Sequence, residues 1–282
     1  MLAVFAGAIA VLMAYLVVTY YRGGRGRPWT TFEPRWAWHR AGIYFCFCYL
    51  ASYTSGGMDR IVNSPVVTAA QKADPVWVAY TIGALAFILV AYAGVWAHFT
   101  PTFDRPRKPL MSAVFGFLWG SSSGQLFVAV WVLADKSALP TRGAWLLTYV
   151  ILAAFQPNFH NIYWDHYIAP EHDTRMTQKI KALCCHIPNL AITLTYLALY
   201  GNYLIFVTLQ VIACVAAGIA MRYPAPWATA GPLDFAHRSD ARIPRATGYV
   251  SADPQTDPYT PFYRGWHPAD DPGPTRTDVE RV

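Results

Sequence analysis

The chain has 282 residues, of which 55% are hydrophobic and 13% are charged. Because soluble domains carry about 25% charged residues, this composition excludes an ordinary soluble domain. Charges are absent from stretches of roughly 20 residues, the length that a helix needs to cross the hydrocarbon core of a bilayer. The formal net charge of +6 comes from arginines and lysines beside these stretches, where basic residues set orientation. It does not indicate a protein that binds nucleic acid.

Seven apolar segments follow one another along the chain, and each is long enough to cross a bilayer as a helix. They are residues 1–20, 37–54, 76–99, 110–134, 143–163, 184–200 and 204–221. We therefore expect an all-α integral membrane protein with a bundle of about seven transmembrane helices. The first segment is expected to be an anchor rather than a signal peptide, because it lacks a preceding basic region and a small-residue cleavage site. Only Gly201 and Asn202 join the last two segments, so we expect a helical hairpin there.

Basic residues set the orientation that we expect for this bundle. Eleven fall in loops or helix ends on one side, namely Arg22, Arg25, Arg27, Arg35, Arg40, Arg105, Arg107, Lys108, Arg175, Lys179 and Lys181. Four fall on the other side, namely Arg60, Lys72, Lys136 and Arg142. Because lysine and arginine collect on the cytoplasmic side, we predict an outer N-terminus and a cytoplasmic C-terminus. In the alternative arrangement, residues 184–221 form a re-entrant hairpin, and six crossings leave the C-terminus outside.

Three polar interruptions occur within the apolar segments. Residues 120–125 have the sequence Gly-Ser-Ser-Ser-Gly-Gln, and small residues of this kind let neighbouring helices approach closely. The fifth segment contains Gln156-Pro157-Asn158, where the proline is expected to kink the helix. The sixth contains Pro188-Asn189 near its start, which is a milder interruption. The five cysteines, Cys46, Cys48, Cys184, Cys185 and Cys214, lie in or beside apolar segments, and we expect buried free thiols.

The predicted transmembrane domain covers residues 1–222, and a proline-rich cytoplasmic tail covers residues 223–282. The last 59 residues contain ten prolines and no long apolar run, so the tail is expected to be irregular. Its aromatic stretch, residues 257–266, is expected to lie on the cytoplasmic face of the protein or to bind another subunit of a membrane complex. Disorder without a partner is the alternative for this stretch. The composition, rich in alanine and arginine, favours a bacterial plasma membrane.

Six of the eight histidines fall at the predicted cytoplasmic end of the bundle, and none falls at the outer end. They are His39, His98, His160, His166, His172 and His186. Imidazole is the commonest metal ligand, and carboxylates complete the ligand set of iron, zinc or manganese. We therefore predict a metal ion, iron in the first instance, with His98, His160, His166, His172 and His186 as candidate ligands. Asp165 and Glu171 are the candidate catalytic carboxylates or partners of these ligands.

Two alternatives to this metal site remain open. A b-type haem would need only two histidines as cofactor ligands, with His39 or His98 opposite His160 or His186. The other alternative is that these histidines form no site and lie at the membrane–water interface only because histidine, tryptophan and tyrosine all favour it.

The sequence favours a membrane enzyme that acts on a lipid or another hydrophobic substrate, as a metal-dependent oxidoreductase. A metal-free isoprenoid cyclase or isomerase, in which an acid protonates the substrate and aromatic rings stabilise the cation, is one alternative. A non-catalytic subunit that docks through its tail is another. Proton-coupled transport is disfavoured because no carboxylate lies within a predicted crossing. A retinal-binding protein is disfavoured because no lysine lies in the middle of a crossing.

Overall fold

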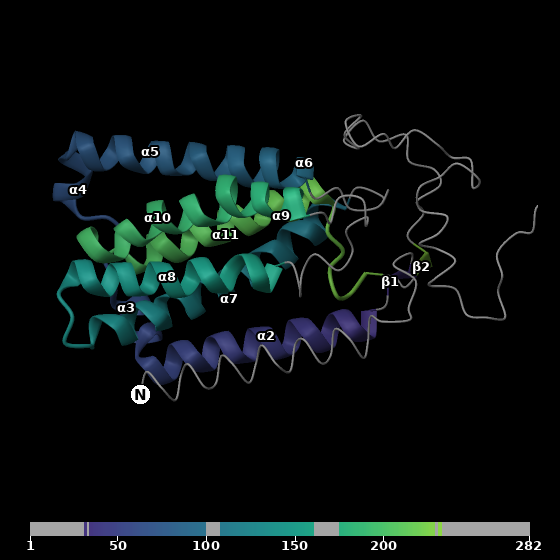
Figure 1. The fold of residues 1–282 in the computed structure, drawn as a ribbon, viewed down its shortest axis with the longest axis horizontal. Coiled ribbons are helices and arrows are strands. Elements are labelled where there is room, and N and C mark those ends of the chain that lie inside the picture. Colours follow the sequence, from purple (N-terminus) through teal and green to yellow (C-terminus); the bar gives the residue numbers. More distant parts are fainter. Residues whose placement is uncertain (1–30, 33, 100–107, 161–174, 229–230, 233–282) are drawn as a thin grey trace, which may run out of the picture.

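The structure is a computed structural model that describes residues 31–32, 34–99, 108–160, 175–228 and 231–232. Within these residues, six long helical segments lie side by side and run in alternating directions (Figure 1). The first predicted segment, residues 1–20, lies outside the described part of the chain. So does nearly all of the predicted tail.

Five of the six long segments have bounds within a few residues of those expected, whereas the segment expected at 184–200 begins nine residues earlier, at Arg175. The six segments are α2 (Pro34–Ser55); α5 (Pro75–Leu89) with η1 (Val90–Trp96) and α6 (Ala97–Phe99); α7 (Pro109–Asp135); α8 (Thr141–Phe159); α9 (Arg175–Lys181) with η5 (Ala182–His186), α10 (Ile187–Thr195) and η6 (Tyr196–Tyr200); and α11 (Tyr203–Met221). The short helices α3 (Gly57–Asn63) and α4 (Ala69–Ala73) connect α2 to α5 at one end of the bundle. The elements η1, η5 and η6 are π-helical turns within otherwise α-helical segments.

Four of these helical segments are long and apolar enough to cross a membrane: Pro75–Phe99, Pro109–Asp135, Met176–Tyr200 and Tyr203–Met221. This finding agrees with the prediction of a helical membrane protein. The helices α2 and α8 are less hydrophobic than these four segments. Two arginines stand near the start of α2, and α8 combines Arg142 with the polar run that begins at Gln156.

Among the described helices, α7 and α11 are in close backbone contact. A Cβ atom added to Gly120 would lie 2.5 Å from Val211 Cα and 2.6 Å from Gln210 O, and one added to Gly116 would lie 2.7 Å from Cys214 O. Gly124 faces Val207 in the same row, one turn further along α7. Glycines four residues apart form one face of a helix, and such faces bring membrane helices into backbone contact. The prediction that the small residues serve close packing is therefore confirmed.

The other face of the same α7 segment is hydrogen-bonded to α2. Tyr44 Oη lies 2.9 Å from Ser123 Oγ, and Tyr49 Oη lies 2.7 Å from Ser121 Oγ. One turn further along, the Ser52 hydroxyl donates to Gln125 Oε1. The polar run at 120–125 thus does not interrupt α7, which stays helical from Pro109 to Asp135. Ser121, Ser123 and Gln125 are satisfied by α2, and the Ser122 hydroxyl donates to Leu118 O within α7, as polar groups at this depth require.

The predicted hairpin between the last two apolar segments is present. Gly201 adopts φ +62°, a left-handed conformation that glycine reaches without steric cost, and ends the helix that precedes it. Asn202 is fully buried, and its Oδ1 accepts a bond of 2.9 Å from Gln71 Nε2 on α4. The turn is therefore held against the α2–α5 connection.

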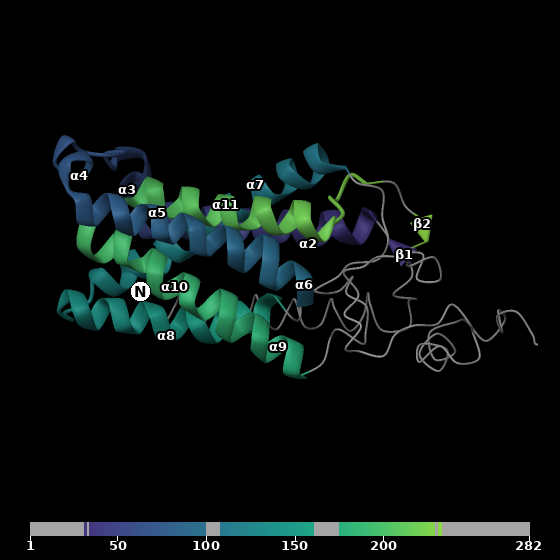
Figure 2. The same cartoon turned by 90° about the horizontal axis from the view of Figure 1, so that it is seen from above.

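Residues that follow α11 fold back onto the start of α2. The strand β2 (Gly231–Pro232) pairs antiparallel with β1 (Thr31–Phe32), and the Trp227 ring lies 5.9 Å from the Trp38 ring. Figure 2 shows both strands beyond the ends of α2 and α11. The described start of the tail is therefore packed against the bundle, whereas residues 257–266 lie outside the described residues.

The five cysteines are free thiols, as expected, but only three of them are buried. Cys46 on α2 and Cys184 on η5 are exposed on outer helix faces. A small, weakly polar thiol is compatible with a surface that faces lipid, so the expectation of burial was wrong for these two.

Candidate functional site

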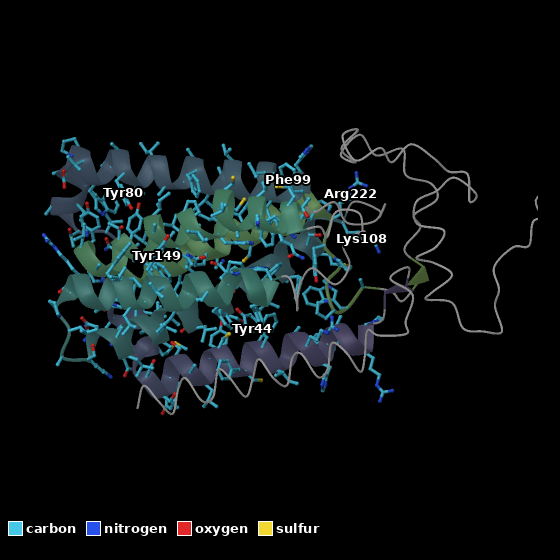
Figure 3. All side chains as sticks on the ribbon, viewed as in Figure 1. Tyr44, Tyr80, Phe99, Lys108, Tyr149 and Arg222 are labelled. Carbon is cyan, nitrogen blue, oxygen red and sulfur yellow. The ribbon has the colours of Figure 1, made fainter. Side chains whose placement is uncertain are left out.

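Two of the predicted ligand histidines meet inside the bundle. His160 directly follows the last residue of α8 as its C-cap, and His186 is the last residue of η5. Their imidazole rings are stacked with centroids 4.5 Å apart and planes 7° apart, and both side chains are buried, with 5% and 2% of their surface exposed. Figure 3 labels Phe99, Lys108 and Arg222 at one end of the bundle, and the end of α8 and the α9–η5 segment lie toward this same end (Figure 1).

Two tryptophans enclose the stacked imidazoles. The Trp96 ring stands perpendicular to both, with centroids 4.9 Å from His160 and 4.8 Å from His186. The Trp119 ring lies 5.3 Å from His160. Both indoles are almost completely buried, so the imidazole pair is surrounded by aromatic surface.

The two imidazoles differ in their hydrogen bonding. His186 Nδ1 lies 3.3 Å from the Tyr92 hydroxyl, which leaves its Nε2 atom facing away from this contact. His160 Nδ1 is buried and has no hydrogen-bond partner among the described residues. A buried nitrogen without a partner costs about 1–3 kcal/mol, so a metal ion or a polar ligand at this atom would remove a penalty. Lys181, the last residue of α9, is buried on the same helical segment as His186.

The helices that carry the site are widened at this level. Tyr92 and Trp96 belong to the π-helical turn η1, and His186 belongs to the π-helical turn η5. The two turns are joined where the Cys185 thiol donates to Ala91 O over 3.3 Å. A π-turn shifts the register of a helix and re-aims its side chains, and such turns are frequent at functional sites.

A chain of neutral polar side chains lies one helical turn deeper than the imidazoles. Asn189 Nδ2 donates to Gln210 Oε1 over 3.3 Å, and Gln210 Nε2 donates to Thr193 Oγ1 over 3.0 Å. The Thr193 hydroxyl in turn donates to Asn189 O over 2.7 Å. On α8, Gln156 stands one turn before His160. Gln156 Oε1 and Asn189 Oδ1 are both buried without a partner among the described residues.

The other predicted site residues are not part of this cluster in the described structure. His39 on α2 and His98 on α6 are exposed, and the His98 ring packs on Phe99 with centroids 4.9 Å apart. Asp165, His166, Glu171 and His172 lie outside the described residues. In the described ranges, no three histidine, cysteine, aspartate or glutamate side chains stand close enough together to hold a metal ion.

The sequence did not single out Tyr92, Trp96 or Trp119, which complete the cluster, because aromatic residues are common throughout these apolar segments. The sequence positions of two amide residues, Gln156 and Asn189, could have indicated that they lie near the histidines. Gln156 precedes His160 by four residues and Asn189 follows His186 by three, so each amide shares a helix face with a histidine. Each amide stands next to a proline, and the sequence pattern therefore indicates an interrupted helix rather than a site residue.

Comparison with protein-family models, with curated proteins and with solved structures found no match for this chain.

Proposed function

We propose that the chain crosses a bacterial plasma membrane seven times, with its N-terminus outside and its C-terminus in the cytoplasm. Both helices of the 176–221 hairpin are as long as full crossings, which argues against a re-entrant hairpin. The pairing of β1 with β2 keeps the start of α2 and the end of α11 on one side, as six crossings between them require. Arg40 and Lys181 are buried, but without them nine of the remaining thirteen basic residues still favour the proposed cytoplasmic side.

Reporter fusions test this topology. Green fluorescent protein fused after Val282 should fluoresce in bacterial cells, and alkaline phosphatase fused at the same position should be inactive, because the first folds in the cytoplasm and the second outside it. Phosphatase fused after Lys136 should be active. Active phosphatase after Val282 would instead support the six-crossing arrangement.

We also propose that the protein is a membrane enzyme, a metal-dependent oxidoreductase that acts on a hydrophobic substrate at the His160–His186 pair. The observation that carries this proposal is the meeting of two predicted ligands from different helices in a buried, aromatic-walled position. His160 Nδ1 has no partner among the described residues. The contact of His186 Nδ1 with Tyr92 is the kind of hydrogen bond that orients a ligating histidine.

The remaining ligands would come from the segment that directly follows His160, in which Asp165, His166, Glu171 and His172 are the candidates. Two imidazoles with one or more carboxylates form a set that suits iron with open positions. A redox metal bound there would supply the oxidative chemistry. The chain would supply the ligands, the aromatic walls and the exclusion of water.

A metal-free acid–base enzyme is the second candidate, and the aromatic walls favour it. Trp96 and Trp119 both lie against the imidazole pair, and indole rings stabilise a substrate cation through their faces. In that case a histidine or one of the two carboxylates would act as the acid. A non-catalytic complex subunit is the third, and its test is whether the purified protein retains partner subunits.

Elemental analysis and an optical spectrum of the protein purified in mild detergent test the metal proposal. We expect near-stoichiometric iron, lost in the His160→Ala and His186→Ala variants, because each removes a ligand. His237→Ala, which changes a histidine outside the predicted site, should keep its metal. A Soret band lost in His39→Ala or His98→Ala would indicate haem instead. Metal-free wild-type protein, after purification without chelators and reconstitution with ferrous iron, would reject the metalloenzyme.

A further inference from the structure

The helix α2 packs mainly along one side in the described part of the chain. That side lies against α7, and Ala41, Cys48 and Ser52 on it are buried. The opposite side carries residues spaced three and four apart, which therefore form one line along the helix. We call this line the outer face of α2, and it consists of Ile43, Cys46, Leu50 and Tyr53. Leu50 and Tyr53 are 61% and 74% exposed, so the described residues leave much of this face open.

The outer face of α2 is less suited to lipid than the exposed side of α5. The segment Pro75–Phe99 is apolar enough to cross a membrane, and Ile82 and Leu89 are among its exposed side chains. The helix α2 is not among the segments that reach this level, and Tyr49 and Tyr53 are exposed along its second half. Because lipid favours a helix whose outer surface is apolar, α2 is better accommodated between two helices than between one helix and lipid.

The chain itself supplies an apolar segment next to α2. Residues 1–20 contain no charged side chain and are long enough to cross the hydrocarbon core. Residues 21–30 connect this segment to β1, which directly precedes α2. A connection this short places consecutive helices side by side and in opposite directions. The segment 1–20 is therefore the nearest available cover for the outer face of α2.

The segment has a narrow side and a bulky side. Its small residues recur every three or four positions and form one line, which consists of Ala3, Gly7, Ala10 and Ala14. The other side carries larger residues, namely Phe5, Leu12 and Leu16. Small residues let membrane helices approach closely, so the first line fits against the outer face of α2 and the second line suits lipid. When both helices rise about 1.5 Å per residue from the same end, Gly7 comes level with Leu50 and Ala3 with Tyr53.

We infer that residues 1–20 form a transmembrane helix that packs antiparallel on the outer face of α2, with its line of small residues toward that face. The helix α2 then lies between this first helix and α7. The inference rests on the proposed topology, in that both helices must cross the membrane, and it adds the surface on which the first crossing docks. It does not depend on the chemistry proposed for the His160–His186 pair.

Photo-crosslinking of the full chain in membranes tests this packing. The photoreactive amino acid p-benzoylphenylalanine replaces Leu50, a specific protease site is inserted between Gly23 and Gly24, and an epitope tag precedes Met1. After irradiation and cleavage, we expect the tagged fragment to migrate with the rest of the chain on a denaturing gel. The same photoreactive residue at Ile82, which is 64% exposed on α5, is the matched control and should release the fragment.

Substitutions within the segment test which of its sides meets α2. Ala10→Phe places a large ring on the line of small residues. It should lower capture of the fragment from position 50 about tenfold, since overpacking weakens a close contact by about this factor. Leu12→Phe enlarges a residue on the bulky side and should leave capture unchanged. Capture that falls equally in both variants, or in neither, would overturn the inferred orientation of the segment.

Maleimide labelling separates this packing from the proposed topology. A maleimide that does not cross membranes should label Leu2→Cys in intact cells above the wild-type background, because the proposed N-terminus lies outside. Labelled Leu2→Cys without capture from position 50 would keep the topology and overturn the packing. A crosslinked dimer would also overturn it, because a second copy of the chain would then occupy the outer face. Capture from position 50 without labelling of Leu2→Cys would support the packing and reject the outer N-terminus.

Discussion

Replacement of Gly120 by leucine is expected to cost about 3 kcal/mol or more of unfolding free energy. Even the first carbon of the new side chain would lie 2.5 Å from Val211 Cα and 2.6 Å from Gln210 O. These are backbone atoms, so the only relief is separation of α7 from α11. Overpacking of a well-packed contact costs about 1–3 kcal/mol and occasionally more, and a clash with the backbone of the facing helix belongs at the upper end. Unfolding in mixed detergent–SDS micelles, followed by far-UV circular dichroism, measures the change.

Gly83→Leu is the matched control for this substitution. Gly83 lies within α5, and a Cβ atom added there would meet nothing within 4 Å. Because leucine is a better helix former than glycine by about 0.8 kcal/mol, this variant should be as stable as wild type or more so. Equal stability of the two variants would show that α7 and α11 do not approach as closely as described.

Trp96→Ala is expected to lower the unfolding free energy by about 3–5 kcal/mol and to abolish function at the imidazole pair. Trp96 is completely buried and touches both histidines and Trp119. Loss of a buried tryptophan leaves a cavity, and substitutions of this kind cost about 3–5 kcal/mol. The imidazoles would lose the surface that holds them parallel, so metal content should fall together with stability.

Trp38→Ala provides the comparison, because 53% of the Trp38 side chain is exposed and its ring contact is with Trp227. We expect less than about 1 kcal/mol of destabilisation and no loss of metal. Trp96→Phe should restore part of the stability, since it returns a ring to the same space. A Trp96→Ala protein as stable as wild type would contradict the described packing.

The sequence predicted the helices well because the property that selects them is local. An apolar run long enough to cross a bilayer is visible in the chain itself, and the bounds of α2, α5–α6, α7 and α11 agree with the expected segments to within a few residues. The sixth segment shows the limit of this reasoning. It was expected to begin at Cys184, but the helix begins at Arg175, because a polar first turn extends beyond the apolar run.

The site was only partly predictable because it depends on contacts between helices that are distant in sequence. The predicted topology placed His160 and His186 at the same end of the bundle. It did not predict that their rings stack. The apolar pattern shows which residues are in a helix, and not which of its faces meets another helix. The enclosing residues Tyr92 and Trp96 owe their direction to the π-helical turn η1, which no residue pattern marked in advance.

The glycine face of α7 has a consequence for biosynthesis. The helix is mostly buried, yet α11, which covers its glycines, begins 68 residues after α7 ends at Asp135. At a synthesis rate of about 5–20 residues per second, α7 exists for about 3–14 s before its partner emerges. During that interval its bare backbone faces the translocon, lipid or other early helices. The order in which the ribosome delivers the helices therefore leaves the close contact between α7 and α11 until last, and a chain stalled before Tyr203 exposes the glycine face of α7 to the quality-control machinery of the membrane.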